Sequence, residues 1–498
     1  MSVDTPAWVR DAVFYQIFPD RFASSRRVAK PGPLEPWDSP PTTHGFKGGD
    51  LLGIAEKLPY LEDLGVTALY LTPIFTSASN HRYHTYDYLT VDPLLGGDAA
   101  LRELLDAAHA RGMRVVLDGV FNHTGRGFWP FHHILETGLG SPYLDWFHVD
   151  RTVLSGGRSL RPYPVGRSRG PSGYKAWWGL PALPKLNTDH PPVREYLFSV
   201  AEHWLRFGID GWRLDVPQEI DDPTFWREFR QRCRAVRPEA YLVGEIWRPA
   251  PDWLGGDRFD AVMNYPLAEA ILSFTAGERL DREVLRFHDE YARNVRPIDG
   301  PAFAVLLREI LDLYAPEVTL SQLNLIGSHD APRFVTLAGG DRVAFRLATL
   351  LQMTLPGAPC IYYGDEIGLE GGRDPDCRRA FPTDERLWDR ALLDDVRRMV
   401  ALRNEVAAFR SLQTAVVAAE EGGVALVRGE GAGVALVALN TGDRPWRLSA
   451  RVPALAGQSL RSDVWAAGDQ RARTIRLADD GTLDAEVPAR AGLTLRAA

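Results

Sequence analysis

The chain has 498 residues, 45% of them hydrophobic and 24% charged, which is typical of a globular protein and excludes a disordered or fibrous chain. Its formal net charge of -8 offers no basic surface for nucleic acid or anionic lipid, and no apolar run reaches the roughly 18–20 residues of a membrane span. Because the amino terminus also lacks a signal-peptide pattern, we expect a cytoplasmic protein with no nucleic-acid and no membrane partner.

Short β-rich runs alternate with helical patterns from the amino terminus to about residue 405. Segment 98–112 is typical of the helices, with Leu101, Leu105 and Ala108 on one apolar face and Asp98 as a candidate cap. Eight such runs separated by helices predict a (β/α)8 TIM barrel. The expected strands are residues 12–18, 66–73, 113–121, 208–216, 240–246, 259–264, 322–330 and 358–366.

Two segments depart from this repeat. The third expected strand ends near Phe121 and the fourth begins near Ile209, a gap that predicts an inserted subdomain after strand 3. After residue 405, short apolar runs alternate with Gly-rich turns, which predicts a C-terminal all-β sandwich. The expected fold class is therefore α/β. The expected domains are a catalytic barrel at 1–122 and 186–405, an inserted subdomain at 123–185, and the sandwich at 406–498.

Acidic residues lie in or at the ends of four of the expected barrel strands. Asp118, Asp215, Glu245 and Asp330 belong to strands three, four, five and seven, whose carboxyl ends meet at the mouth of such a barrel. Cleavage of a glycosidic bond needs one carboxyl group to protonate the departing oxygen and a second to act on the sugar carbon. Arg213, two residues before Asp215 on the same strand face, could keep that aspartate ionised. The pattern therefore predicts glycosidase chemistry.

Considered singly, several of these residues also have a structural explanation. A carboxylate at a strand end often caps a helix or forms a salt bridge, and His123 and His329 are equally compatible with structural roles. Trp177 and Trp178 suit either the core of the insertion or flat faces for sugar rings.

The remaining histidines predict no metal site. The HRYH sequence at 81–84 has a metal-like spacing, but no plausible third ligand accompanies it. His132 and His133 are expected in a loop, and His109 is expected to be a solvated or capping residue.

Five ordered blocks carry a family resemblance. On these blocks the chain resembles the α-amylase superfamily, glycoside hydrolase family 13, and within it the neopullulanase, cyclomaltodextrinase and maltogenic amylase group. Lysine at position 185 is the feature that favours this group. The blocks are DGVFNH (118–123), LPKLN (183–187), GWRLDVPQEI (211–220), GEIW (244–247) and GSHDAPR (327–333).

The resemblance implies a role for each matching residue. Asp215 would be the nucleophile, Glu245 the general acid/base and Asp330 the third carboxylate, which stabilises the distorted sugar. Asp118 would be an interior support. The residues expected to bind substrate are Tyr83, His123, Arg213, His329 and, from the insertion, Trp178.

The chain departs from the group in two respects. Members commonly carry an additional N-terminal β-domain that forms a dimer, whereas this chain starts almost directly at strand one, so its oligomeric state stays open. The resemblance also implies calcium in the loop after Phe22, but apart from Glu35 and Asp38 this loop lacks acids and amides, and Asn122 has no companions that complete a site. No cofactor is therefore expected to be required.

The activity that the resemblance implies is retaining hydrolysis of α-1,4-glucosidic bonds in maltooligosaccharides, cyclodextrins or pullulan. Two alternatives remain: a transferase or trehalose-synthase-like isomerase of the same superfamily, and a catalytically silent glucan-binding protein. The complete set of carboxylates disfavours the silent protein, whereas the product formed would separate hydrolase from isomerase.

Overall fold

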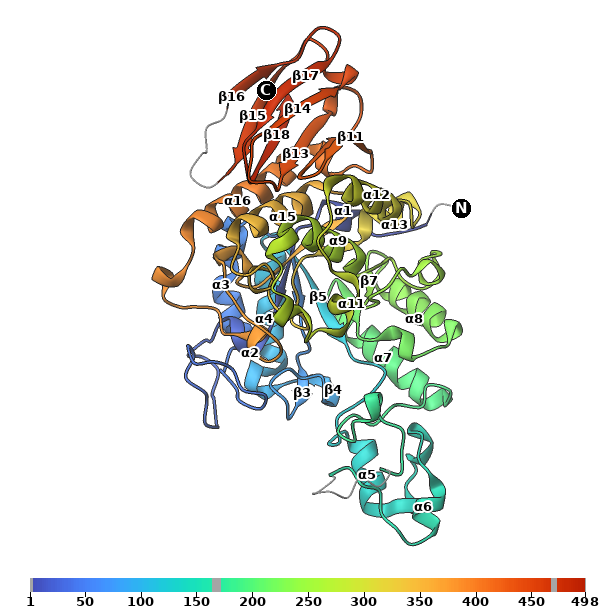
Figure 1. Ribbon diagram of the computed structural model, residues 1–498. Helices are drawn as coiled ribbons and strands as arrows, with labels where there is room; N and C mark the ends of the chain where they lie inside the picture. The colour runs from blue at the N-terminus through green and yellow to red at the C-terminus, as the bar shows by residue number, and fades with distance from the viewer. Residues whose placement is uncertain (1–2, 164–171, 467–472, 498) are drawn as a thin grey trace.

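Eight parallel strands form a barrel at the centre of the molecule. In the computed structural model, which describes residues 3–163, 172–466 and 473–497, they follow the spatial order β8-β7-β6-β5-β2-β1-β10-β9 (Figure 1). A parallel bridge between Met263 and Leu323 joins the two outermost strands and nearly closes the barrel. The strands are β1 (Phe14–Ile17), β2 (Ala68–Leu71), β5 (Arg114–Gly119), β6 (Gly211–Leu214), β7 (Tyr241–Gly244), β8 (Ala261–Val262), β9 (Leu323–Leu325) and β10 (Ala358–Tyr362).

Helices surround these strands, and each expected strand run contains one observed strand. Every residue of β1, β2, β6 and β7 is buried, because side chains on one face fill the barrel and those on the other contact helices. The longer helices are α3 (Leu51–Asp63), α4 (Gly97–His109), α7 (Pro191–Phe207), α8 (Pro223–Val236), α9 (Tyr265–Ala276), α12 (Gly300–Leu311), α15 (Arg342–Thr354) and α16 (Arg390–Glu405).

Helix α4 shows how well the local pattern predicted a helix. Leu101, Leu105 and Ala108 are fully buried, as expected for its apolar face. The predicted cap at Asp98 is wrong, because the cap is Gly96, in the left-handed region, and the helix begins two residues earlier than a cap at Asp98 would allow. Asp98 instead accepts a hydrogen bond from the Val91 amide at 2.9 Å.

Shorter helices and one hairpin complete the barrel region. The hairpin pairs β3 (Phe75–Ser77) with β4 (Thr85–Val91). The short helices are α1 (Ala7–Asp11), α2 (Pro19–Phe22), α10 (Arg282–Leu285), α11 (Asp289–Asn294), α13 (Pro316–Ser321) and α14 (Phe334–Leu337).

The chain between β5 and β6 leaves the barrel and carries α5 (Trp129–Thr137) and α6 (Arg151–Ser155), which lie at the end of the molecule opposite the C-terminus (Figure 1). His132 and His133 lie in α5, so the expectation of a loop there is wrong; Pro130 in the first turn starts the helix. Part of the expected subdomain, residues 164–171, lies outside the described residues. We propose boundaries at 123 and 185, where an antiparallel bridge joins His123 to Lys185.

Two antiparallel sheets follow α16, which agrees with the expected fold class. The larger has the order β11-β12-β13-β18-β15-β16 and the smaller pairs β14 with β17. Along β13, Leu436 packs between the two sheets, whereas Val437 packs toward the barrel, so both faces are buried. We propose that this domain begins at 406. The strands are β11 (Thr414–Glu420), β12 (Gly423–Arg428), β13 (Ala435–Asn440), β14 (Trp446–Arg451), β15 (Ser459–Trp465), β16 (Arg473–Arg476), β17 (Thr482–Val487) and β18 (Ala491–Ala497).

No helix within the described ranges is long and apolar enough to cross a membrane.

Candidate active site

One guanidinium group lies among three carboxylates at the mouth of the barrel. Arg213 Nη1 is 2.8 Å from Asp118 Oδ1 and 3.0 Å from Asp215 Oδ1, and its Nη2 is 3.0 Å from Glu245 Oε2. All four side chains are buried. They come from the ends of the adjacent strands β5, β6 and β7, as the sequence predicted, because parallel strands bring their carboxyl ends together.

The single positive charge of Arg213 does not neutralise three ionised carboxylates. Burial raises the pKa of Asp215 well above its usual range and also raises the pKa of Glu245, while the Arg213 charge acts against both changes. The Asp330 carboxylate nearby raises both pKa values further. Because one cation compensates fewer charges than three carboxylates carry, the site favours an ionised carboxylate beside a protonated carboxyl group.

The backbone and an indole ring both hold Glu245. The Val216 amide donates to Glu245 Oε2 at 3.1 Å, and Trp247 Nε1 donates to Oε1 at 3.1 Å. Val216 adopts φ 35°, a left-handed conformation that is costly for a β-branched residue and that places its amide toward Glu245. The Trp247 ring stacks on Tyr265 with centroids 3.5 Å apart. Trp247 was not among the residues predicted from the sequence, although the GEIW block contains it.

Asp330 occupies a more open place than the other three acids, with a side chain that is 30% exposed. Its Oδ2 is 3.1 Å from His329 Nε2, and Arg378 Nη2 donates to its Oδ1 at 3.3 Å. Arg378 Nε also donates to the His329 carbonyl at 2.8 Å. Arg378 was not predicted from the sequence, because it lies in a three-residue 3-10 helix, Asp376–Arg378, outside every recognised block.

A chain of hydrogen bonds connects His329 to Asp118 through Tyr83. Gln16 Nε2 lies 2.8 Å from His329 Nδ1, and Tyr83 Oη lies 2.5 Å from His329 Nε2. Since the Gln16 amide donates to Nδ1, the imidazole proton is on Nε2 and points toward Tyr83. Tyr83 in turn donates to Asp118 Oδ2 at 2.8 Å, as does Tyr70. Burial lowers the pKa of His329 well below its usual range, which keeps this ring neutral.

Three stacked rings extend from the site toward solvent. The His123 and Trp177 centroids are 5.0 Å apart, and the Trp177 and Trp178 centroids are 4.6 Å apart. Burial lowers the pKa of His123 to about 3, and its Nε2 has no hydrogen-bond partner among the described residues. Trp178 is 79% exposed and has φ 51°. The structure therefore places the predicted His123 and Trp178 at opposite ends of one stack.

The HRYH segment and His109, which the sequence also singled out, take part in other contacts. The His81 and His84 ring centroids are 4.9 Å apart, but across 3–163, 172–466 and 473–497 no three His, Cys, Asp or Glu side chains form a group that could hold a metal ion. His109 Nε2 lies 2.8 Å from Oδ2 of the buried Asp210, a contact that the expectation of a solvated or capping residue did not include.

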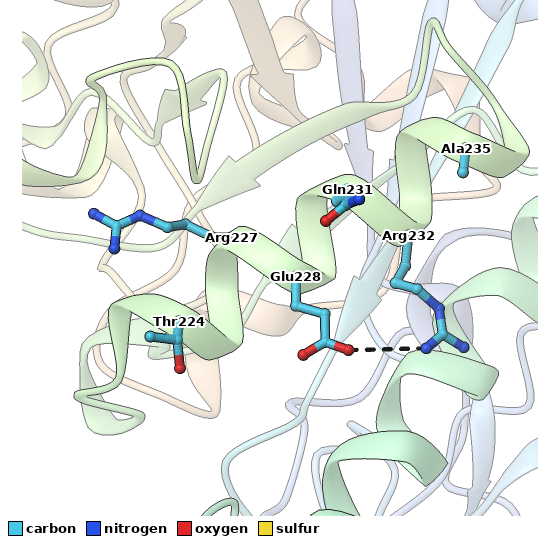
Figure 2. A pocket seen from close by; sticks show the side chains of 6 residues that line it. All are labelled: Thr224, Arg227, Glu228, Gln231, Arg232 and Ala235. Carbon is cyan, nitrogen blue, oxygen red and sulfur yellow. Dashed lines mark ion pairs between the residues drawn. The ribbon is translucent and has the colours of Figure 1, made fainter.

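A shallow surface hollow of about 470 Å³ lies on helix α8, away from the strand ends (Figure 2). Figure 2 shows Arg227, Glu228 and Arg232 on this one helix, with an ion pair between Glu228 and Arg232 at 4.0 Å. Arg232 also pairs with Glu195 and Glu202 of the neighbouring helix α7. The convergent carboxylates are elsewhere, at the barrel mouth, so that mouth is the candidate site.

The chain matches the family model described as alpha amylase, catalytic domain, over residues 16–414. It is 46% identical over 407 residues to a cyclomaltodextrinase of Geobacillus thermopakistaniensis and 44% identical over 406 residues to neopullulanase 2 of Thermoactinomyces vulgaris. Each alignment covers 81% of this chain but 64% of the relative, so the chain spans somewhat less than two thirds of their length. A debranching enzyme of Nostoc punctiforme has a similar structure, with a TM-score of 0.86 and 44% identity, covering 99% of this chain and 100% of that one.

Proposed function

Because the chain belongs to glycoside hydrolase family 13, the α-amylase family, we propose that it is a retaining hydrolase of α-1,4-glucosidic bonds. Its substrates would be maltooligosaccharides, cyclodextrins or pullulan. The observation that carries this proposal is the Arg213 guanidinium, which lies 3.0 Å from carboxylate oxygens of both Asp215 and Glu245. Two carboxyl groups that flank one guanidinium suit a retaining glycosidase, whose acid and nucleophile are about 5 to 5.5 Å apart.

In the first step, Asp215 attacks the anomeric carbon while Glu245 gives its proton to the departing glycosidic oxygen. The bond between the sugar carbon and that oxygen breaks, and a glycosyl ester forms on Asp215. Burial favours the protonated form of both carboxyl groups and Arg213 favours the ionised form of both, so the cluster can hold one proton beside one negative charge, and the first step needs that proton on Glu245. In the second step Glu245 takes a proton from water, and the water oxygen replaces the aspartate on the sugar carbon.

The other predicted residues would bind the sugar around this bond. Asp330, with its more exposed carboxylate, would accept hydrogen bonds from hydroxyl groups of the distorted sugar. The unpartnered His123 Nε2 would donate a hydrogen bond to another hydroxyl. Tyr83 and His329 would form one wall of the first glucose subsite, because their rings stack with an interplanar angle of 4°. Trp178 would offer its exposed ring to a sugar farther along the chain. The reaction needs only carboxyl groups and water, so we propose no cofactor.

The names of the similar proteins support the choice of substrates. Cyclomaltodextrinase and neopullulanase 2 are named for cyclic maltodextrins and pullulan, and the Nostoc punctiforme protein is named a debranching enzyme. A transferase or isomerase would share the first step and differ in what resolves the glycosyl ester, so the products decide between these reactions.

The test is to incubate the purified protein separately with γ-cyclodextrin, pullulan, maltotriose and maltose, and to identify the products by chromatography. We expect opening of the ring and appearance of maltose and glucose with retained anomeric configuration. Conversion of maltose into trehalose without new reducing ends would establish an isomerase instead. The Asp215→Asn variant is the control: it should bind glucan but lose turnover, and full turnover by this variant would refute the assigned nucleophile.

A further inference from the structure

A long irregular loop, residues 23–50, connects α2 to α3 beside the barrel mouth. Its residues are all described and form no helix or strand, and ordered loops of this length are uncommon in a compact domain, so we ask which contacts order this one. The family resemblance implies that calcium supplies these contacts. The structure instead places two lysine ammonium groups among the oxygen atoms of this loop.

Lys30 forms an ion pair with Asp50, a fully buried carboxylate at the end of this loop. Its Nζ donates to Asp50 Oδ2 at 3.0 Å and to the Leu94 carbonyl at 2.9 Å. The same Oδ2 accepts the Ser25 amide at 2.8 Å, and Asp50 Oδ1 accepts the Gly53 amide at 2.7 Å. Both carboxylate oxygens of Asp50 are therefore engaged by protein donors, which leaves little capacity for a metal ion.

Lys47 lies within a second set of oxygen atoms and is itself fully buried. Its Nζ donates to the Pro36 carbonyl at 2.7 Å, to the Ser39 carbonyl at 2.8 Å and to Ser39 Oγ at 2.6 Å. Glu35 Oε2 is 3.4 Å from the same nitrogen. Two carbonyls, one hydroxyl and one carboxylate thus surround a single positive charge, much as oxygen atoms surround a bound cation.

The rarity of lysine makes these two positions unusual. The sequence has 57 Lys and Arg residues together but only five lysines. Two of the five are Lys30 and Lys47. Lysine differs from arginine in carrying a compact point charge with three donors, which suits a small cage of oxygens better than a planar guanidinium does.

We propose that the ammonium groups of Lys30 and Lys47 replace a divalent cation in this loop, so that the fold of the loop is independent of calcium. The residues present do not fit calcium, which takes six to eight oxygen ligands, because Asp50 is already occupied and Asp38 is exposed. This inference concerns the folding of the loop and does not rest on the proposed reaction.

The loop also supports the barrel mouth. Asn80 Nδ2 donates to the Thr43 carbonyl at 3.1 Å and to the Gly45 carbonyl at 2.8 Å. Asn80 precedes Tyr83 by three residues, and Tyr83 contacts both His329 and Asp118. The lysines would therefore act as positioning residues for the segment that carries Tyr83.

The experiment compares thermal unfolding of the 498-residue chain in millimolar EDTA and in millimolar calcium chloride. We expect the same Tm in both, because a ligand that binds only the native state would raise it. Lys30→Met and Lys47→Met shorten the side chain by one atom and remove the charge, and each should lower Tm by roughly 3 °C or more. Trypsin should also cleave these variants faster after the exposed Arg26 and Arg27.

Lys57→Met is the matched control, since Lys57 is a half-buried lysine of α3 just beyond the loop. Its Tm and its cleavage rate should equal those of the parent protein. A higher Tm in calcium than in EDTA, or one calcium per chain in the purified protein by elemental analysis, would overturn the inference. Lys30→Met and Lys47→Met variants as stable as Lys57→Met would overturn it equally, and none of these results depends on catalytic activity.

Discussion

Buried arginines lie at both ends of the barrel, but their partners differ. At the carboxyl ends of the strands, Arg213 faces the carboxylates of Asp118, Asp215 and Glu245. At the opposite end, next to the C-terminal sheets, Arg403 donates to backbone carbonyls, including those of Gly357 at 2.6 Å and Met353 at 3.1 Å. Both arginines are 0% exposed.

Arg428, on strand β12, is another buried arginine that donates to backbone carbonyls. It donates to the carbonyls of Thr354 at 2.6 Å and Ser411 at 2.7 Å, and so joins the C-terminal domain to the end of α15. A carbonyl cannot take up a proton at any ordinary pH, whereas a carboxylate can. The same kind of buried side chain therefore controls protonation at one end of the barrel and cohesion between domains at the other.

Arg213→Met should show most clearly how the roles of the buried arginines at the two ends of the barrel differ. Without the cation, the pKa of Asp215 should rise further, because Arg213 is the charge that opposes the effect of burial, and a smaller fraction of Asp215 would be ionised at neutral pH. We expect kcat/KM for maltotriose to fall by about 10⁴-fold, measured from pH 5 to pH 8. Activity within tenfold of the parent protein would show that Arg213 does not control the carboxylates.

Arg403→Met should have the converse effect. Several buried carbonyls would lose their donor, so we expect the free energy of unfolding in urea to fall by about 3–5 kcal/mol. The kcat/KM of the folded protein should remain within twofold. The control is Arg390→Met on the same helix, where the side chain is 58% exposed and no stability change is expected. A large loss of activity in folded Arg403→Met would contradict the division of roles.

Glu366 adds a third case, because it is a buried carboxyl group that contacts hydroxyl groups instead of an arginine. Tyr15 and Tyr60 both donate to its Oε1 at 2.7 Å, and burial raises its pKa from 4.5 to about 7. The native state therefore holds this proton more tightly than the unfolded chain does, so stability falls as pH rises from about 4.5 to about 7.

Glu366→Gln should remove this dependence. Across that window the parent protein should lose about 3 kcal/mol of unfolding free energy relative to the variant. The measurement is urea denaturation of both proteins at several pH values. Burial also raises the pKa of the adjacent Asp365, to about 6, so the variant should keep the pH dependence that Asp365 causes and lose the part that Glu366 causes. Equal slopes of unfolding free energy against pH for the two proteins would show that Glu366 has no raised pKa in the native state.

The smallest effect is expected for Trp178→Ala, at the exposed end of the ring stack. Loss of one aromatic face should raise KM for long maltooligosaccharides by about 3–10-fold, with little change in stability because the ring is 79% exposed. Trp129→Ala is the control, since Trp129 is 60% exposed on α5 in the same insertion. Equal kinetics for the two variants would remove Trp178 from the predicted substrate-binding residues.

Much of the fold and part of the site could be predicted from the sequence. Eight β-rich runs predicted eight strands, and the acids in or at the ends of three adjacent strands predicted the cluster around Arg213, because strand polarity places those ends together. Gln16 and Arg378 could not be found in this way. Their contacts with His329 and Asp330 join positions 313 and 48 residues apart, and neither lies in a pattern that distinguishes it from other polar residues.

Local sequence patterns alone therefore specified the barrel, the insertion and the identities of the four acidic residues, because strand and helix formation depend on neighbouring residues. Only the tertiary structure decided how the charges balance: one guanidinium among three carboxylates, a glutamic acid between two tyrosines, and two lysines within a loop. The reason is physical. The energy of a charge depends on its burial and on its distance to other charges, and folding sets both by bringing together residues that lie far apart in the chain.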